Sequence, residues 1–287
     1  MFQLKEHGTD VRTEITAGMT TFLTMAYIVI VNPVILGAAG VPFDQVFLAT
    51  IIAAVIGTLW MALLANYPIA IAPGMGLNAY FTSMVLASGG AIDYTTAFAA
   101  VFVSGLLFVA LYLTSMGKIL IEAIPENLKH AITAGIGLFI AFIGMRLSGF
   151  IVANEANLVG LGDLTSPPVA LTLAGLAITL IFMSLNIHGG IFFGMIATGI
   201  IAFFTGQLSF TEGFMKLPSL PEGIIVWNPI EAFLLVAEFG LYGVVFSFLL
   251  VTLFDTTGTM IGVAKQAGLM KDNKIPRVRQ ALLADSV

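Results

Sequence analysis

Long runs of apolar residues recur along this chain, and short polar segments separate them. Eight runs approach or exceed the ~20 residues that a helix needs to cross the hydrocarbon core of a bilayer. The last run is long enough to be tilted, or to begin as an interfacial helix around Pro229 and Glu231. The pattern predicts an all-α polytopic membrane protein with spans near 15–38, 47–66, 69–88, 95–115, 130–150, 168–186, 190–207 and 236–264.

The third run is interrupted by Ala72-Pro73-Gly74-Met75-Gly76-Leu77-Asn78. One proline and two glycines in four residues do not readily continue a helix. We expect an extended lead-in at 67–72, a glycine-rich turn and a half-helix that begins near Leu77. Non-helical backbone at membrane depth is buried in protein or lines a wet cavity, and the half-helix would direct free N–H groups at it. A kink without a ligand is the alternative, but the polar Asn78 at this point favours a binding site.

The eighth run contains Asp255, within Phe254-Asp255-Thr256-Thr257-Gly258-Thr259. An aspartate at the centre of a membrane helix costs roughly 2.5–3.5 kcal/mol on insertion scales, and such residues normally mark an ion or substrate path. A structural hydrogen bond to a neighbouring helix is the other interpretation.

The first run carries Thr16, Thr20 and Thr24 on one helix face, which Tyr27 continues. Threonine hydroxyls in membrane helices commonly bond to their own backbone carbonyls. The stripe therefore either has this local role or lines a cavity beside the interrupted span. Asn32-Pro33 predicts a kink or a helix end at which Asn32 caps locally.

Composition agrees with a membrane protein, because 59% of the 287 residues are hydrophobic and 9% are charged. The chain has no cysteine and its three histidines are scattered, so no metal site and no other cofactor is expected. An enzyme would need a nucleophile–base pair or a metal cluster within the bilayer, and the sequence suggests neither.

The distribution of positive charge predicts the orientation. With a cytoplasmic N-terminus, nine of the eleven Lys and Arg residues fall on inner segments, in agreement with the positive-inside rule. We therefore expect a multi-pass protein of the cell (inner) membrane. The inner residues are Lys5, Arg12, Lys118, Lys129, Lys265, Lys271, Lys274, Arg277 and Arg279.

The proline-containing stretch 208–235 separates seven runs from the eighth and predicts a boundary between two units. Spans four to seven are expected to be scaffold, with helices packed closely through small residues. The glycines concerned are Gly135, Gly137, Gly144, Gly194 and Gly199.

Several blocks together resemble the azaguanine-type purine permeases (hypoxanthine, guanine and adenine) of the nucleobase–cation symporter-2 family. These blocks are Thr20 to Ile28 with Asn32-Pro33, Ala72 to Phe81, Phe254 to Ala264, and Pro276 to Ser286. The resemblance covers the whole chain, and the combination is far more specific than one short pattern.

The resemblance implies fourteen spans in two inverted seven-span repeats. Residues 1–207 would form the first repeat, with core spans at 15–115 and gate spans at 130–207. Residues 208–235 would then be the linker between repeats, and 236–287 would hold span eight and a cytoplasmic segment. The resemblance also implies that the chain stops, at Val287, before spans nine to fourteen and a second essential glutamate.

The function implied is secondary active import of a purine nucleobase by alternating access. The coupling ion would be a proton, or less readily sodium, and a homodimer is possible. Asp255 would accept from the purine and carry the proton, while Asn78 would donate to ring acceptors. Alternatives are an anion or other small-solute transporter of the same fold, an inactive fragment, or half of a split transporter. The expected substrate site comprises Asn78, Asp255, Gly76, Thr259, Thr24 and Tyr27.

Overall fold

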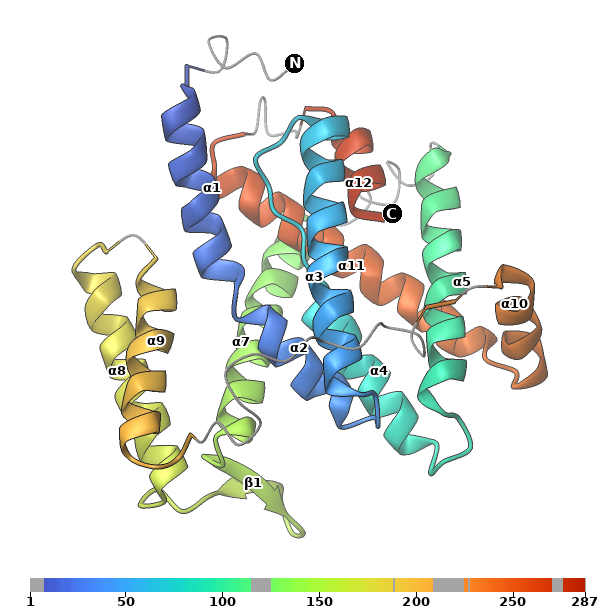
Figure 1. Cartoon of the computed structure of the whole chain (residues 1–287). Coiled ribbons are helices and arrows are strands. Elements are labelled where there is room, and N and C mark those ends of the chain that lie inside the picture. Colours follow the sequence, from blue (N-terminus) through green and yellow to red (C-terminus); the bar gives the residue numbers. More distant parts are fainter. Residues whose placement is uncertain are drawn as a thin grey trace. The chain divides into compact units, whose positions relative to one another are not determined.

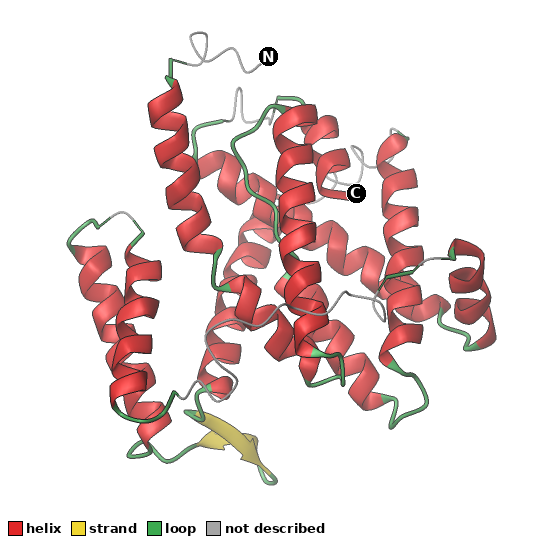
Figure 2. Ribbon diagram, viewed as in Figure 1, coloured by secondary structure: helices red, strands yellow, loops and turns green. Residues whose placement is uncertain are grey.

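The computed structural model describes residues 8–114, 125–187, 189–208, 225–226, 228–269 and 276–286. These residues are mostly helical, with one two-stranded sheet (Figure 2). Within them, five helices or helix pairs are long and apolar enough to cross a membrane, which confirms the expected all-α polytopic class. They are Val11–Gly37, Phe43–Ala65, Tyr94–Leu113, Pro167–Ser184 and Tyr242–Gln266.

The chain forms two compact units. One comprises Met1–Tyr27 and Gly137–Leu217, and the other comprises Ile28–Ile136 and Pro218–Val287. Helix α7 (Glu126–Leu147) runs across their boundary. Most of the predicted 208–235 linker lies outside the described residues.

The first unit contains α1 (Val11–Met25), the end of α7, and the helices α8 (Pro167–Ser184) and α9 (Gly190–Phe204). Helix α1 begins where the Asp10 carboxylate accepts a hydrogen bond from the Thr13 backbone N–H at 2.7 Å, which lowers the pKa of Asp10. Helix α8 begins with a proline at its first position, where the missing N–H costs nothing.

The connection between α7 and α8 contains a β-hairpin. Strands β1 (Ile151–Asn154) and β2 (Leu158–Leu161) pair antiparallel in this unit. The Asn154 side-chain oxygen accepts hydrogen bonds from the Ala156 and Asn157 N–H groups at 2.9 and 3.0 Å, and this local turn closes the hairpin.

Helices α8 and α9 lie side by side as an antiparallel pair (Figure 1). Two glycines let them approach, because a Cβ on Gly194 would lie 2.9 Å from the Thr179 Cβ, and one on Gly175 would lie 2.8 Å from the Thr198 Cγ2. The predicted close packing is confirmed at Gly194. Within the part of the chain that the structure describes it is wrong for the other four glycines, because no atom outside their own helix backbone lies within 4 Å of an added Cβ: Gly135, Gly137, Gly144 and Gly199.

The second unit contains α2 (Ile28–Gly37), α3 (Phe43–Trp60) with a final π-turn η1 (Met61–Ala65), α4 (Met75–Ala87) and α5 (Tyr94–Leu113). It also contains the later helices α10 (Pro229–Glu238), α11 (Tyr242–Gln266) and α12 (Val278–Ser286).

Two of the predicted spans are divided. The first span is two helices, with α1 ending at Met25 and α2 beginning at Ile28. The eighth is also two, because the chain turns through Gly240, whose φ of 64° is a left-handed conformation that glycine tolerates. The alternative start near Pro229 therefore matches α10.

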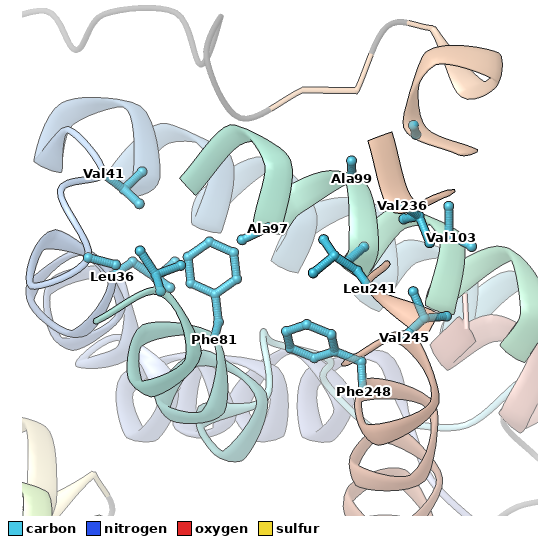
Figure 3. Packing of buried hydrophobic residues seen from close by; sticks show 14 of the residues in the cluster. Leu36, Val41, Phe81, Ala97, Ala99, Val103, Val236, Leu241, Val245 and Phe248 are labelled. Carbon is cyan, nitrogen blue, oxygen red and sulfur yellow. The ribbon is translucent and has the colours of Figure 1, made fainter. Parts of the chain in front are cut away.

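An apolar cluster holds α2, α4, α5, α10 and α11 together (Figure 3). Phe81 of α4 packs on Phe98 of α5 with ring centroids 4.6 Å apart, and Tyr80 meets the edge of Phe248 of α11 at 5.0 Å. A second cluster, which includes Met61, Phe108, Tyr112, Leu253 and Leu282, joins η1, α5, α11 and α12. In a bilayer such clusters stabilise through close packing, because lipid tails are as apolar as the side chains.

The glycine contact between α8 and α9 gives a testable prediction. In Gly194→Ala the new Cβ would meet the backbone Cα of Thr179 at 3.1 Å, which cannot rotate away. Overpacking costs about 1–3 kcal/mol and exceeds the ~1 kcal/mol that alanine adds to helix propensity. We expect a lower thermal unfolding midpoint in detergent. Gly199→Ala is the matched control and should be neutral or stabilising; equal stability of the two variants would contradict the packing described.

Candidate functional site

Residues 66–74 form the non-helical lead-in to α4, and side chains supply its hydrogen bonds. The Ile71 N–H donates to the Thr58 hydroxyl at 3.0 Å, and this hydroxyl donates to the Ile71 carbonyl at 3.3 Å. The Tyr67 hydroxyl donates to the Pro276 carbonyl. Gly57 leaves room for the segment, since a Cβ there would lie 2.9 Å from the Ile71 Cγ2. The backbone N–H and carbonyl of Ile71 are thus both paired, as the bilayer would require if this segment lies within it.

The half-helix begins where the sequence predicts it, within two residues. Gly74 is the N-cap of α4, with φ −70° and ψ 119°, and the Asn78 N–H makes the first helical hydrogen bond to the Gly74 carbonyl at 3.2 Å. The N–H groups of residues 75–77 precede this bond, so they have no acceptor within the helix. Their partial positive charge favours an anion nearby.

The Asp255 carboxylate lies against this helix start. A Cβ added to Gly74 would overlap the Asp255 Oδ2 and would stand 3.6 Å from its carboxyl carbon. The carboxylate therefore occupies the place that a side chain at position 74 would take. One turn further along α11, the Thr259 hydroxyl donates to the Asp255 carbonyl at 2.6 Å and approaches its Oδ1 at 3.4 Å.

Asn78 follows Gly74 by four residues. Gly74 is the N-cap, so the Asp255 carboxylate approaches the start of α4 one turn before Asn78, and both polar groups lie at the same end of the half-helix. The break thus brings together a carboxylate from α11, an amide from α4 and the N-terminus of α4.

Asn32 does not cap locally as predicted. It lies inside α2, which continues through Pro33 to Gly37, and is 4% exposed. Its side chain bridges helices: its Oδ1 accepts from the Asn78 Nδ2, and its Nδ2 donates to the Thr50 hydroxyl at 2.7 Å. The local pattern misled because these partners lie on other helices.

The remaining predicted site residues divide between the units. Gly76 lies in the first turn of α4, with open space within 4 Å of an added Cβ. In the first unit, the Thr24 hydroxyl donates to the Thr21 carbonyl at 2.8 Å, and Tyr27 is half-buried. Thr16 and Thr20 likewise bond to carbonyls of their own helix, as threonines in membrane helices commonly do. A role for Thr24 or Tyr27 in the site stays a prediction.

Asp285 is a second carboxylate close to the site to which the sequence analysis assigned no role. The Thr256 hydroxyl of α11 donates to its Oδ2 at 2.5 Å, and α12 packs against η1 and α5. The sequence does mark this residue as a candidate, because Asp285 is a carboxylate that directly follows the apolar run Ala281-Leu282-Leu283-Ala284. The contact itself depends on how α12 folds back, which no local pattern specifies.

The described part of the chain contains no group of three or more His, Asp or Glu residues that could hold a metal ion. The break offers a carboxylate, an amide, a hydroxyl and unpaired helix N–H groups instead. This set can bind a neutral polar molecule that has both donors and acceptors.

Comparison with known proteins identifies the family. The profile of the xanthine/uracil group, described as the permease family, matches residues 12–287. The chain belongs to the permease family. The guanine/hypoxanthine permease PbuO of Bacillus subtilis is 67% identical to this permease over 287 residues. The guanine/hypoxanthine permease PbuG of Bacillus subtilis is 46% identical over 296 residues, and the adenine permease AdeP of Escherichia coli is 42% identical over 290.

These matches cover 99–100% of this chain, but only 64–66% of the relatives. The permease described here thus spans just under two thirds of their length.

The Thr58 contact gives a prediction about the lead-in to α4. Thr58→Val keeps the shape of the side chain but leaves the Ile71 N–H and carbonyl without their partner, and each buried unpaired group costs about 1–3 kcal/mol. We expect a clearly lower unfolding midpoint of the purified protein. Thr58→Ser retains the hydroxyl and should preserve most of the stability. If valine were as stable as serine, the hydroxyl would not hold this segment.

Proposed function

We propose that this permease imports a purine nucleobase, guanine or hypoxanthine, by secondary active transport at the break in its third span. The proposal rests on the position of the Asp255 carboxylate. It lies against Gly74 at the N-terminus of the half-helix, one turn before Asn78. Broken helices of this kind form the midplane sites of secondary transporters. Two of the relatives compared above are guanine/hypoxanthine permeases, and this supports the choice of substrate.

The chemistry of the site suits such a base. Guanine and hypoxanthine offer ring N–H donors beside carbonyl and ring-nitrogen acceptors. Asp255 accepts from a ring N–H, and in guanine also from the exocyclic amine, in charge-assisted hydrogen bonds. The N–H groups at the start of α4 donate to ring or carbonyl acceptors. Gly76 and Thr259 border this position along α4 and α11.

Coupling to a proton follows from the same carboxylate. Asp255 is half-buried in a helix that crosses the membrane, where a fixed charge is costly. If a proton and the purine bind together, the occupied site carries less charge than the empty site, and the protonated carboxyl keeps an oxygen that accepts from the purine. Asp255 is therefore the proposed proton carrier, in preference to a sodium site.

The wider arrangement is proposed by analogy with the family. Residues 1–207 would form one inverted repeat and 236–287 the start of another, with 208–235 between them. The core would rock against the gate to expose the break alternately to each side. The N-terminus would be cytoplasmic, in the cell (inner) membrane, and two copies would form a homodimer.

The first test removes the charge. Asp255→Asn keeps the size of the side chain but loses charge-assisted acceptance, worth about 1.5–3 kcal/mol, or roughly 10–100-fold in affinity. We expect cells that lack other purine carriers, and express this permease from its intact gene, to stop accumulating labelled hypoxanthine. A protonophore should have the same effect on wild type, whereas removal of sodium should have none.

Glu155→Gln is the matched control, because the same chemical change falls on the exposed hairpin turn. It should transport at the wild-type rate. Membrane levels of both variants are compared by immunoblot. Accumulation by Asp255→Asn at the wild-type level would exclude Asp255 from both proposed roles.

The second test fills the space beside Asp255. In Gly74→Ala the new methyl group takes the volume that the carboxylate occupies, so Asp255 must leave the helix start. We expect uptake to fall at least tenfold while the protein still reaches the membrane. Gly105→Ala in α5, which has no atom within 4 Å of the added Cβ, should be neutral. Normal uptake by Gly74→Ala would show that transport does not need the contact between Asp255 and Gly74.

A further inference from the structure

A continuous chain of hydrogen bonds runs from a helix carbonyl to the proposed binding site. The Thr50 hydroxyl donates to the Val46 carbonyl within α3 at 2.7 Å and accepts from the Asn32 Nδ2 at 2.7 Å. The Asn32 Oδ1 then accepts from the Asn78 Nδ2. Asn32 and Thr50 are 4% and 1% exposed, so water does not compete for these bonds.

The direction of every bond in this chain is set at one end. The Val46 carbonyl is only an acceptor, so the single Thr50 proton must point at it. The Thr50 oxygen can then only accept, and the Asn32 amide must turn its Nδ2 toward Thr50. The Asn32 Oδ1 consequently faces Asn78, whose Nδ2 must donate. The opposite amide orientation would place two lone pairs against each other in a buried site.

The consequence for Asn78 is a fixed hydrogen-bonding pattern. One N–H is committed to Asn32, which leaves the carbonyl oxygen with both lone pairs and a single N–H. Asp255 lies against Gly74, one turn before Asn78 at the start of α4, and when ionised offers only acceptors. The start of the half-helix therefore presents two acceptors, although the sequence suggested Asn78 as a donor.

We propose that Asn32 and Thr50 are positioning residues, which hold the Asn78 oxygen and the Asp255 carboxylate as an acceptor pair that selects a substrate edge with N–H donors. This inference rests on the proposed purine transport. Hypoxanthine carries a hydrogen on N1, and guanine adds an exocyclic amine beside it. Adenine has a lone pair at N1, which an acceptor repels.

The test is a change of selectivity in Thr50→Val. This variant leaves the Asn32 Nδ2 without an acceptor, so both amides are free to turn, and the Asn78 N–H groups can then donate to N1 of adenine. In competition against labelled guanine uptake, wild type should prefer hypoxanthine over adenine about tenfold or more. In Thr50→Val this ratio should fall to about threefold or less, through a gain in adenine affinity.

Two variants act as controls. Thr50→Ser keeps the hydroxyl and should retain the wild-type ratio. Thr82→Val removes another buried hydroxyl between α4 and α2, which donates to the Ile35 carbonyl at 3.0 Å outside the amide chain. It should also retain the ratio. An unchanged ratio in Thr50→Val at normal membrane levels, or a wild type that prefers adenine, would overturn the proposal.

A second readout does not depend on transport. In ¹⁵N-labelled protein the side-chain amide protons of Asn32 should exchange slowly with solvent in wild type and Thr50→Ser, and at least tenfold faster in Thr50→Val. If neither the wild type nor any variant takes up purines, the proposed function fails. The exchange of the Asn32 amide protons then decides the positioning role by itself. Equal exchange in Thr50→Val and wild type would refute it.

Discussion

The structure depends on one constraint: a membrane does not tolerate unpaired backbone groups, yet this chain abandons helical hydrogen bonding at residues 66–74. The elements around the break supply hydrogen-bond partners or space for this segment. Thr58 of α3 pairs both backbone groups of Ile71, and Tyr67 reaches Pro276, which precedes α12. Gly57 leaves room for the side chain of Ile71 against α3. The break is therefore held by its neighbours.

The same geometry explains why a carboxylate is found here. The start of α4 has N–H groups without helical acceptors and a residue without a side chain, and Asp255 fits both features. Apolar packing brings it there, because Tyr80 of α4 stacks edge-on against Phe248 of α11, two turns before Asp255 (Figure 3 shows Phe248 in this cluster). Packing thus positions the carboxylate beside the N-terminus of α4.

The sequence could predict features that local chemistry determines. A helix break is predicted by the backbone properties of Pro73, Gly74 and Gly76. Asp255 stands out as a candidate site residue because a charge is costly within an apolar run. Features that depend on tertiary contacts were missed or misjudged. Asn32 beside Pro33 has the pattern of a local cap, but its partners are on α3 and α4. Asp285 and the division of the eighth span at Gly240 likewise depend on how the chain folds back.

The two polar groups at the break differ in a way that suits a coupled transporter. Asn78 is an amide, so its hydrogen bonds do not change with protonation, and a buried chain that ends on the Val46 carbonyl fixes their direction. Asp255 is titratable, and among the described residues its carboxylate lies near the Thr259 hydroxyl and against Gly74. In the proposed mechanism the rigid amide recognises the purine equally in every cycle. The carboxylate can then gain and lose its proton without disturbing the orientation of the Asn78 amide, because no hydrogen bond of the amide chain passes through it.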